Sequence, residues 1–331
     1  MIAAGRDSAA APRAGTLALS LLAVPLNVRI LDALAKKSKS LVALRRAGGS
    51  PSTTTMRMHM RTLARAGVVE RRGRDGFTNS ATFGLTPAGQ ELLEVAAVLK
   101  AWLASAPGPE LEFGSVDAAG KVSTLVAGWS AGIVRLLAAR PLSPAELDQI
   151  VKSRDVGSLE RQLGGMSLAG LTEPAPGSDS EARHKPTHWL RQAIAPLAAA
   201  AHWERKTGLD GATPISRLDV EAAFLLSTPL VQLSPQLEGT CRLVVEIHPG
   251  AGSRHAGAVL TVERGRVALC TTRIHGQVDS WVAGPPSSWL HAVIEGEPEC
   301  LDSGGSDRLS AAVLEGLHVA LFGPRQGGPA A

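Results

Sequence analysis

The chain has 331 residues, of which 44% are apolar, 19% are charged and only 3% are aromatic, with no tyrosine. This length favours two or three domains, and this composition supports a buried core while excluding a collagen, a coiled coil, a disulfide scaffold and a disordered tail. The net charge of +4 is distributed unevenly, because residues 1–108 carry 15 Lys and Arg against 6 Asp and Glu, whereas residues 209–331 carry 8 against 13.

The first segment, residues 1–108, ends at the helix-breaking sequence Pro107-Gly108-Pro109. An apolar stretch over 14–26 keeps helical spacing beyond its end, so we expect a helix there rather than a secretion signal. Ser50 is predicted to cap a helix with proline at its first position, where the missing N–H is tolerated. In chain order, we predict helices over 16–35, 40–47 and 51–66, strands over 68–70 and 82–85, and a helix over 86–106.

The second segment, residues 109–208, repeats the first. Three pairs of stretches match at offsets of 103 to 106 residues: 28–33 with 134–139, 66–70 with 169–173, and 82–85 with 187–190. Ordered matches at a nearly constant offset indicate a duplicated domain. In the second copy, Ser143 and Glu146 are predicted to form a capping box, and a helix over 157–169 corresponds to the third helix of the first copy.

Two stretches of the first copy carry a family resemblance, residues 63–70 (LARAGVVE) and residues 84–93 (GLTPAGQELL). They resemble the HxlR and MarR-like bacterial regulators, which implies a winged helix-turn-helix in residues 1–108. Through the repeat, a second winged helix is expected in residues 109–208. The second copy departs from the pattern where Leu190-Arg191-Gln192-Ala193 replaces the Leu-Thr-Pro-x-Gly step, so its contact with DNA stays open.

The uneven charge is typical of a nucleic-acid-binding domain joined to another module. In a winged helix, the third helix and the hairpin would contact double-stranded DNA, because arginine suits guanine edges and hydroxyl groups suit phosphates. The candidate DNA-binding residues are Ser52, Thr53, Thr54, Arg57, Met58 and Arg61 on the helix and Arg71, Arg72 and Arg74 on the hairpin. The alternative is a solvated basic face on a dimerisation module.

The third segment, residues 209–331, follows a second break at 208–214 and has the alternating pattern of strands. We predict a helix over 217–227, strands over 242–248, 257–263 and 266–272, a strand and a proline-started helix within 279–296, and a helix over 307–322. This order predicts an α+β domain. The whole chain is therefore expected to be mostly α, with two tandem winged helices followed by an α+β C-terminal domain.

The hairpin at Arg264-Gly265-Arg266 and the segment over 281–290 (WVAGPPSSWL) resemble the sterol carrier protein-like lipid-binding domain. That family encloses an apolar tunnel between its sheet and its helices. The resemblance implies a site for a hydrophobic small molecule, lined by Trp281, Trp289, Leu290, Val293, Leu314 and Leu317. The same side chains form an ordinary core if the tunnel is filled.

These inferences predict a cytoplasmic transcriptional regulator whose C-terminal domain binds a hydrophobic effector, and not an enzyme. The expected partners are double-stranded DNA and the effector, with no membrane, for either a homodimer or a single chain that imitates one. Three cysteines without a CxxC pair are typical of a reducing compartment, and no metal-ligand spacing is present. No cofactor is expected.

Two alternatives stay open. The chain could instead sequester a hydrophobic toxin or antibiotic, with the winged helices as an oligomerisation scaffold. Residues 128–132 (GWSAG) also match the nucleophile elbow of serine hydrolases, with Ser130 as the nucleophile. The repeat argues against a hydrolase, because it places Ser130 in the first helix of the second winged domain.

Overall fold

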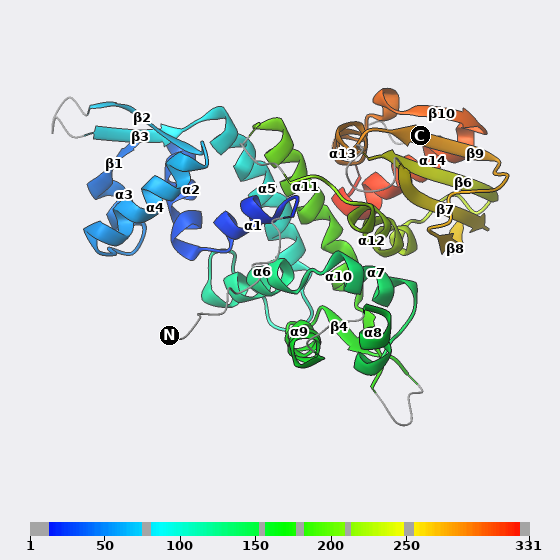
Figure 1. Ribbon diagram of the computed structural model, residues 1–331. Helices are drawn as coiled ribbons and strands as arrows, with labels where there is room; N and C mark the ends of the chain where they lie inside the picture. Colours follow the sequence, from blue (N-terminus) through cyan, green and yellow to red (C-terminus); the bar gives the residue numbers. More distant parts are fainter. Residues whose placement is uncertain are drawn as a thin grey trace, which may run out of the picture.

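Figure 1 shows a computed structural model of the chain, which describes residues 13–74, 81–151, 156–176, 182–208, 213–247 and 255–324. Helices make up most of the first two segments, and a sheet flanked by helices makes up the C-terminal segment (Figure 1). The coarse prediction, a mostly α chain with an α+β C-terminal part, is confirmed.

The first segment combines a group of helices with a small antiparallel sheet. Its elements are α1 (Thr16–Leu22), α2 (Pro25–Lys36), β1 (Lys39–Ser40), α3 (Leu41–Ala47), α4 (Thr53–Arg65), β2 (Val69–Arg74), β3 (Ala81–Leu85) and α5 (Pro87–Ala104). The strands pair in the order β1-β3-β2, so that β2 and β3 form a hairpin between α4 and α5.

Two predictions for this segment are wrong. The single helix expected over 16–35 is two helices that bend by 86°, because Pro25 begins α2 and offers no N–H to continue the hydrogen bonds of α1. Ser50 does not cap α4, since it has a φ of 58°; instead, Ser52 Oγ accepts from Thr55 N at 3.0 Å. Helix α4 therefore begins two residues later than predicted.

The described residues of the second segment follow a similar order, with an isolated bridge in place of strand β1 and two helices after the hairpin. They are α6 (Val116–Gly128), α7 (Ala131–Ala139), α8 (Pro144–Val151), α9 (Val156–Leu168), β4 (Thr172–Pro174), β5 (His184–Pro186), α10 (His188–Gln192) and α11 (Ile194–Lys206). Leu142 bridges to His184 in β5, as β1 pairs with β3 in the first segment. The predicted capping box is confirmed, since Ser143 N donates to Glu146 Oε2 at 2.8 Å and Glu146 N donates to Ser143 Oγ at 3.2 Å.

Local geometry recurs between the two segments as well. Helices α6 and α7 bend by 89°, close to the angle between α1 and α2. Thr86 Oγ1 donates to Gly67 O at 2.5 Å, and Thr187 Oγ1 donates to Gly170 O at 2.9 Å. The sequence match of Thr187 with Thr82 is therefore in the wrong register, because Thr82 lies inside β3 whereas Thr86 and Thr187 each cap a helix.

The first two segments share one hydrophobic core. The rings of Trp102 on α5 and Trp189 on α10 stack with their centroids 4.2 Å apart, and each indole N–H donates to the carbonyl oxygen of the other residue, at 3.0 and 2.9 Å. Glu204 on α11 accepts from the N–H groups of Gly15 and Ala18 at 2.7 and 3.0 Å. This buried carboxylate caps α1 from 189 residues away.

The third segment is a five-stranded sheet with helices on one face. Its elements are α12 (Arg217–Ser227), β6 (Gly239–Glu246), β7 (His255–Glu263), β8 (Arg266–Thr271), β9 (Ser280–Gly284), α13 (Pro286–Glu295), β10 (Asp302–Gly305) and α14 (Asp307–Phe322), with short 3-10 turns at Thr228–Leu230 and Pro298–Cys300. The strand order is β10-β9-β6-β7-β8, and β6 and β9 are parallel.

The predicted elements of the third segment agree closely with these bounds. The helices over 217–227 and 307–322 are confirmed to the residue, and the predicted strands are shifted by at most three residues where they are described. Residue 248, the predicted end of a strand, lies outside the described residues. Strand β10 was missed, because its sequence Asp-Ser-Gly-Gly has no apolar alternation.

Glu204 gives a pH-dependent prediction. Burial raises the pKa of its carboxyl above the ordinary value of 4.5, although its backbone N–H donors act in the opposite direction. The native state therefore binds a proton more readily than the unfolded state, so this group contributes more stability as pH falls towards 4.5. The amide of Glu204→Gln has one acceptor oxygen for two N–H groups, and we predict a loss of about 1–3 kcal/mol of unfolding free energy at pH 7.

Urea unfolding of both proteins at pH 7 and at pH 5 measures this loss. The difference in unfolding free energy between wild type and Glu204→Gln is expected to be larger at pH 5, because only the wild type takes up the additional proton. A difference that shrinks on acidification would contradict the assigned direction of the pKa.

Candidate functional site

Helix α4 presents a basic face to solvent. Met56, Met60 and Leu63 are buried, as their spacing of three and four residues predicts. Every predicted DNA-binding residue of the helix is exposed on the remaining surface: Thr53, Thr54, Arg57, Met58 and Arg61, preceded by Ser52. The hydroxyl of Ser52 serves as the cap of the helix, so it is already engaged.

In the described structure, no ion pair neutralises the arginines of this face. Among the described residues, Arg57, Arg61 and Arg65 form no ion pair, and α4 contains no acidic residue. Arg45, on the neighbouring helix α3, donates from Nη1 to Thr53 Oγ1 at 3.1 Å. The face therefore carries an uncompensated positive potential.

The hairpin departs from the prediction. Arg71 is exposed on β2, but Arg72 pairs with Glu70 at 2.8 Å and donates from Nη2 to Leu85 O at 2.7 Å. Its guanidinium thus has partners within the hairpin, and its contact with a phosphate stays a prediction. The side chain of Arg74 and residues 75–80, which include the predicted turn, lie outside the described residues.

The corresponding surface of the second segment lacks this charge. Three buried residues of α4 have apolar counterparts 103 residues later in α9: Met56, Met60 and Leu63 correspond to Leu159, Leu163 and Met166. The exposed arginines have no cationic counterpart, since Arg57, Arg61 and Arg65 correspond to Glu160, Gly164 and Leu168. Leu168 is 88% exposed. Helix α9 therefore matches the buried side of α4, whereas its exposed side keeps one cation, Arg161, beside Glu160.

Two other cations of the second segment are paired within it. Arg183 Nη2 lies 3.1 Å from Glu146 Oε1, and Lys185 Nζ lies 3.1 Å from Glu173 Oε1. Lys185 and Glu173 lie on the paired strands β5 and β4, which correspond to the hairpin of β2 and β3. A polyanion would have to compete with these carboxylates.

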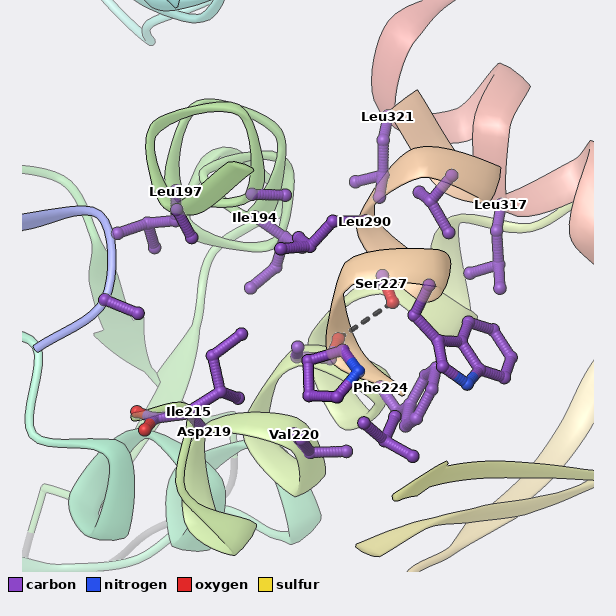
Figure 2. Close-up of a pocket in the computed structure, with 18 of the residues that line it drawn as sticks. Ile194, Leu197, Ile215, Asp219, Val220, Phe224, Ser227, Leu290, Leu317 and Leu321 are labelled. Atoms are coloured by element: carbon purple, nitrogen blue, oxygen red, sulfur yellow. Dashed lines mark hydrogen bonds between the residues drawn. The ribbon is translucent and has the colours of Figure 1, made fainter. Parts of the chain in front are cut away.

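An apolar cavity of about 160 Å³ lies between the second and third segments (Figure 2). Its walls come from α11 on one side and from α12, α13 and α14 on the other. Its lining residues include Trp129, Ile194, Leu197, Asp219, Phe224 and Trp289. Asp219 is the one ionisable side chain among the described lining residues.

Four of the six residues predicted to bind a ligand line this cavity: Trp289, Leu290, Val293 and Leu317. Two do not. Leu314 lines a separate hollow beside Glu297 and Glu299. Trp281 is 38% exposed and alternates along β9 with the buried residues Ser280 and Val282, so it points away from the helix-covered face of the sheet.

The cavity lies at the junction of two segments, and Val245 of β6 is the one sheet residue among its described lining residues. The contribution of α11, through Ile194, Leu197, Ala198 and Ala201, was missed because these residues have the ordinary pattern of a core helix. Trp289 is fixed in the wall, since its Nε1 donates to Val244 O at 2.7 Å. No sequence pattern predicted the contact between α11 and the third segment.

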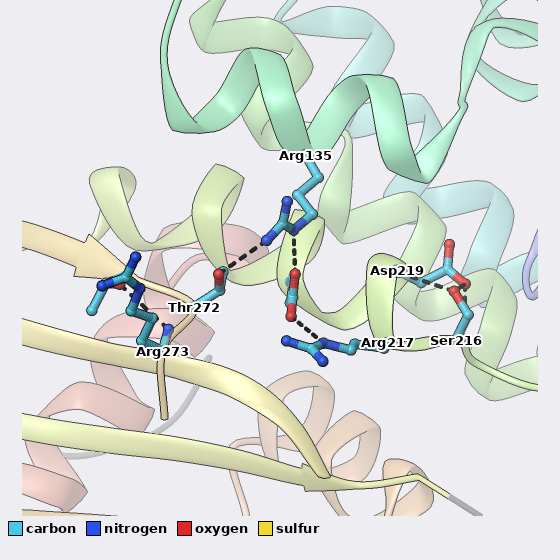
Figure 3. Close-up of polar contacts among 8 residues, drawn as sticks. Arg135, Ser216, Arg217, Asp219, Thr272 and Arg273 are labelled. Atoms are coloured by element: carbon cyan, nitrogen blue, oxygen red, sulfur yellow. Dashed lines mark hydrogen bonds and ion pairs between the residues drawn. The ribbon is translucent and has the colours of Figure 1, made fainter. Parts of the chain in front are cut away.

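A charged cluster around one buried carboxylate joins α7 of the second segment to α12 of the third (Figure 3). The Glu221 carboxylate on α12, which is 1% exposed, accepts from Arg135 Nε on α7 and, at 2.6 Å, from Arg217 Nε. Arg135 Nη2 also donates to Thr272 Oγ1 at 3.1 Å. We call these three charged residues the Glu221 cluster.

Ser130 does not have the setting of a hydrolase nucleophile. It occupies the N-cap position of α7, and residues 122–127, which an elbow would require as a strand, belong to α6. The sequence predicted that Ser130 lies inside the first helix of the second segment, but it lies between α6 and α7. In the described part of the chain, no group of three or more His, Cys, Asp or Glu side chains is arranged to hold a metal ion.

No protein-family model matches the chain, and no curated protein matches it. Among the described helices, none is long and apolar enough to cross a membrane alone; only the bent pairs α1–α2 and α6–α7 reach that length and apolar character together. The two candidate sites are therefore defined by their own chemistry.

The Glu221 cluster gives a stability prediction. Arg135→Met removes one of the two cations that neutralise a buried carboxylate, and we expect a loss of about 1.5–3 kcal/mol of unfolding free energy. Adding Glu221→Met should recover part of it, because no unpaired buried charge then remains. Denaturant titrations of the single and double variants measure both effects, and a double variant less stable than Arg135→Met alone would contradict the assignment.

Proposed function

We propose that the chain is a cytoplasmic DNA-binding transcriptional regulator whose effector is a hydrophobic small molecule. In this proposal, the first two segments are tandem winged helix-turn-helix units, and the third is a sterol carrier protein-like ligand-binding unit. The order helix, strand, helix, helix, strand, strand, helix from α2 to α5 supports the first assignment, together with the β1-β3-β2 sheet.

The observation that carries the proposal is the basic face of α4. Arg57 and Arg61 are one turn apart on the exposed side of a helix whose other side is fixed by buried Met56, Met60 and Leu63. A helix with this geometry can lie in a major groove, where unpaired guanidinium groups bind guanine edges or phosphates.

We propose that the chain binds DNA through the first unit alone. Glu160, Gly164 and Leu168 occupy the positions at which α4 has arginines, and Arg161 is the one cation among the described residues of α9, so this helix attracts a phosphate backbone far less than α4 does. The chain would then imitate a dimer in shape but carry one recognition helix. An inverted-repeat operator would require a second chain, bound as a homodimer on the DNA.

The effector site is proposed to be the junction cavity. A ligand there would touch α11, which packs against α1 and α5 of the first unit. Ligand binding changes the pose of these helices only to the extent that the ligand binds one pose more tightly than another. A difference of about 1–3 kcal/mol is sufficient for a measurable change in DNA affinity.

The alternative is a protein that sequesters a hydrophobic toxin or antibiotic without binding DNA. The apolar lining of the cavity favours this function as much as it favours an effector site. The two proposals differ in the role of α4, since sequestration makes no use of its arginines.

Replacing the arginines of α4 tests the proposal. Genomic footprinting first supplies an operator, and fluorescence anisotropy then gives the affinity for it. We predict that Arg57→Ala and Arg61→Ala each weaken operator binding by about 1–3 kcal/mol. The matched control is Arg161→Ala on α9, which should leave affinity unchanged; equal affinities for all variants would leave sequestration as the better explanation.

The hairpin supplies a second prediction about DNA binding. Arg71→Ala should weaken binding to operator and non-operator duplexes alike and make the slope of log affinity against log salt shallower by about one. Arg72→Ala, in contrast, removes a hydrogen bond to β3 and should lower stability. Anisotropy across a salt series distinguishes them, and an unchanged slope for Arg71→Ala would exclude a phosphate contact.

A further inference from the structure

One end of helix α1 lies at the junction cavity. Ala14, just before the helix, is among the lining residues, as is Leu197 on α11. Gly15 has a φ of 83° and comes so close to α11 that a Cβ atom there would lie 2.8 Å from Leu197 O. Figure 2 shows Leu197 beside the blue segment that leads into α1. Since Glu204 on α11 also accepts from Gly15 N and Ala18 N, the start of α1 is held to the cavity wall that α11 forms.

The other end of α1 lies at the bend between α1 and α2. Asn27 on α2 donates from Nδ2 to Leu21 O in the last turn of α1, at 3.0 Å, and so spans the 86° bend. Asn27 is only 2% exposed, so water cannot replace this hydrogen bond if it breaks. One buried side chain therefore ties the end of α1 to α2.

The same side chain also reaches α4. His59 Nδ1 lies 2.8 Å from Asn27 Oδ1. Because the Nδ2 of Asn27 donates to Leu21 O, its Oδ1 is the acceptor, and His59 carries the hydrogen on Nδ1. Apart from the bond between Arg45 and Thr53, this is the one side-chain hydrogen bond from α4 to another helix among the described residues. The amide group of Asn27 therefore joins the end of α1 to the helix with the basic face.

We infer that Asn27 transmits a change at the cavity to α4. A ligand that displaces α11 or Ala14 also displaces α1, and Leu21 O moves with that helix. Asn27 keeps both of its hydrogen bonds only if His59, and with it α4, changes position as well. Control of DNA binding by this route rests on the proposed function, whereas the coupling of α1 to α4 does not. Asn27 is a positioning residue, because it is buried and does not line the cavity.

Apolar packing between α2 and α4 is the alternative route for such a change. An isosteric substitution distinguishes the two routes. Asn27→Leu keeps the branched shape of the side chain, so apolar contacts persist, but it removes the hydrogen bonds to Leu21 and His59. Transmission through the amide group is lost in this variant, and transmission through packing is kept.

Filling the cavity tests the inference without a known ligand. Ala198 on α11 lines the cavity, and Ala198→Leu places a larger apolar group at that wall. Hydrogen–deuterium exchange of the full-length chain, followed by mass spectrometry, reports on α1 and α4 separately. We expect Ala198→Leu to change amide exchange rates in both helices by about threefold or more. Unchanged exchange in α4 would overturn the inference.

The double variant assigns the coupling to the amide group. Relative to Asn27→Leu alone, Ala198→Leu combined with Asn27→Leu should still change exchange in α1 and no longer change it in α4. The matched control is Thr62→Ala, which removes the hydrogen bond from Thr62 Oγ1 to Met58 O within α4 and should leave the response of α4 intact. A response of α4 that survives Asn27→Leu would overturn the inference in favour of packing.

Two replacements of the half-buried His59 keep the coupling testable if Asn27→Leu does not fold. In His59→Asn, the side-chain N–H can still donate to Asn27 Oδ1, whereas His59→Leu offers no donor. The response of α4 to Ala198→Leu is expected to persist in the first variant and to disappear in the second. Equal responses in the two variants would contradict a role for the hydrogen bond.

Operator binding separates this inference from the proposed function. If Ala198→Leu changes exchange in α4 and also changes operator affinity by about fivefold or more, both are supported. If exchange in α4 changes and operator affinity does not, the coupling is supported and the effector role of the cavity is overturned. If exchange in α4 is unchanged while Arg57→Ala still weakens operator binding, the coupling is overturned and the regulator stands.

Discussion

The packing of helix α11 is the constraint on which the arrangement of the chain depends. It contacts α1 and α5 of the first segment and α12, α13 and α14 of the third. Its run of small residues, with Ala199, Ala200 and Ala201 buried, lets these helices approach from several sides. Trp203 Nε1 donates to Ala88 O at 2.7 Å, and Glu204 caps α1. Because close-packed helices cannot move independently, a shift of α11 at the cavity would also shift the helices of the first and third segments that pack against it.

Helices α4 and α9 are alike where they are buried and differ where they are exposed. The buried positions of α4 and α9 stay apolar because a polar residue there would lose its hydration without a hydrogen-bond partner. The exposed positions carry no such constraint. Arg57 and Arg61 on α4 therefore correspond to Glu160 and Gly164 on α9. The corresponding positions share apolar burial but differ in positive charge, which is the reason for proposing that one helix binds DNA.

Sequence patterns predicted the elements well where one local rule dominated. The helix over 217–227 is bounded by a capping box, and the helix over 307–322 has a continuous apolar stripe. The predictions failed where local rules competed. Pro25 divides an apolar stretch that spacing alone joins, and Ser52 rather than Ser50 caps α4 because Ser50 has a positive φ. The match of Thr187 with Thr82 failed because two identities within four residues do not fix register.

The sequence by itself predicted the order of most helices and strands, the α+β character of the third segment and the basic face of α4, since each follows from spacing within one element. Only the tertiary structure decided that Arg72 is engaged by Glu70, that Trp281 faces away from the helices, and that the cavity lies at a junction. The physical reason is distance along the chain. The cavity walls extend from Ala14 to Leu321, and their meeting depends on how whole helices pack rather than on any local sequence rule.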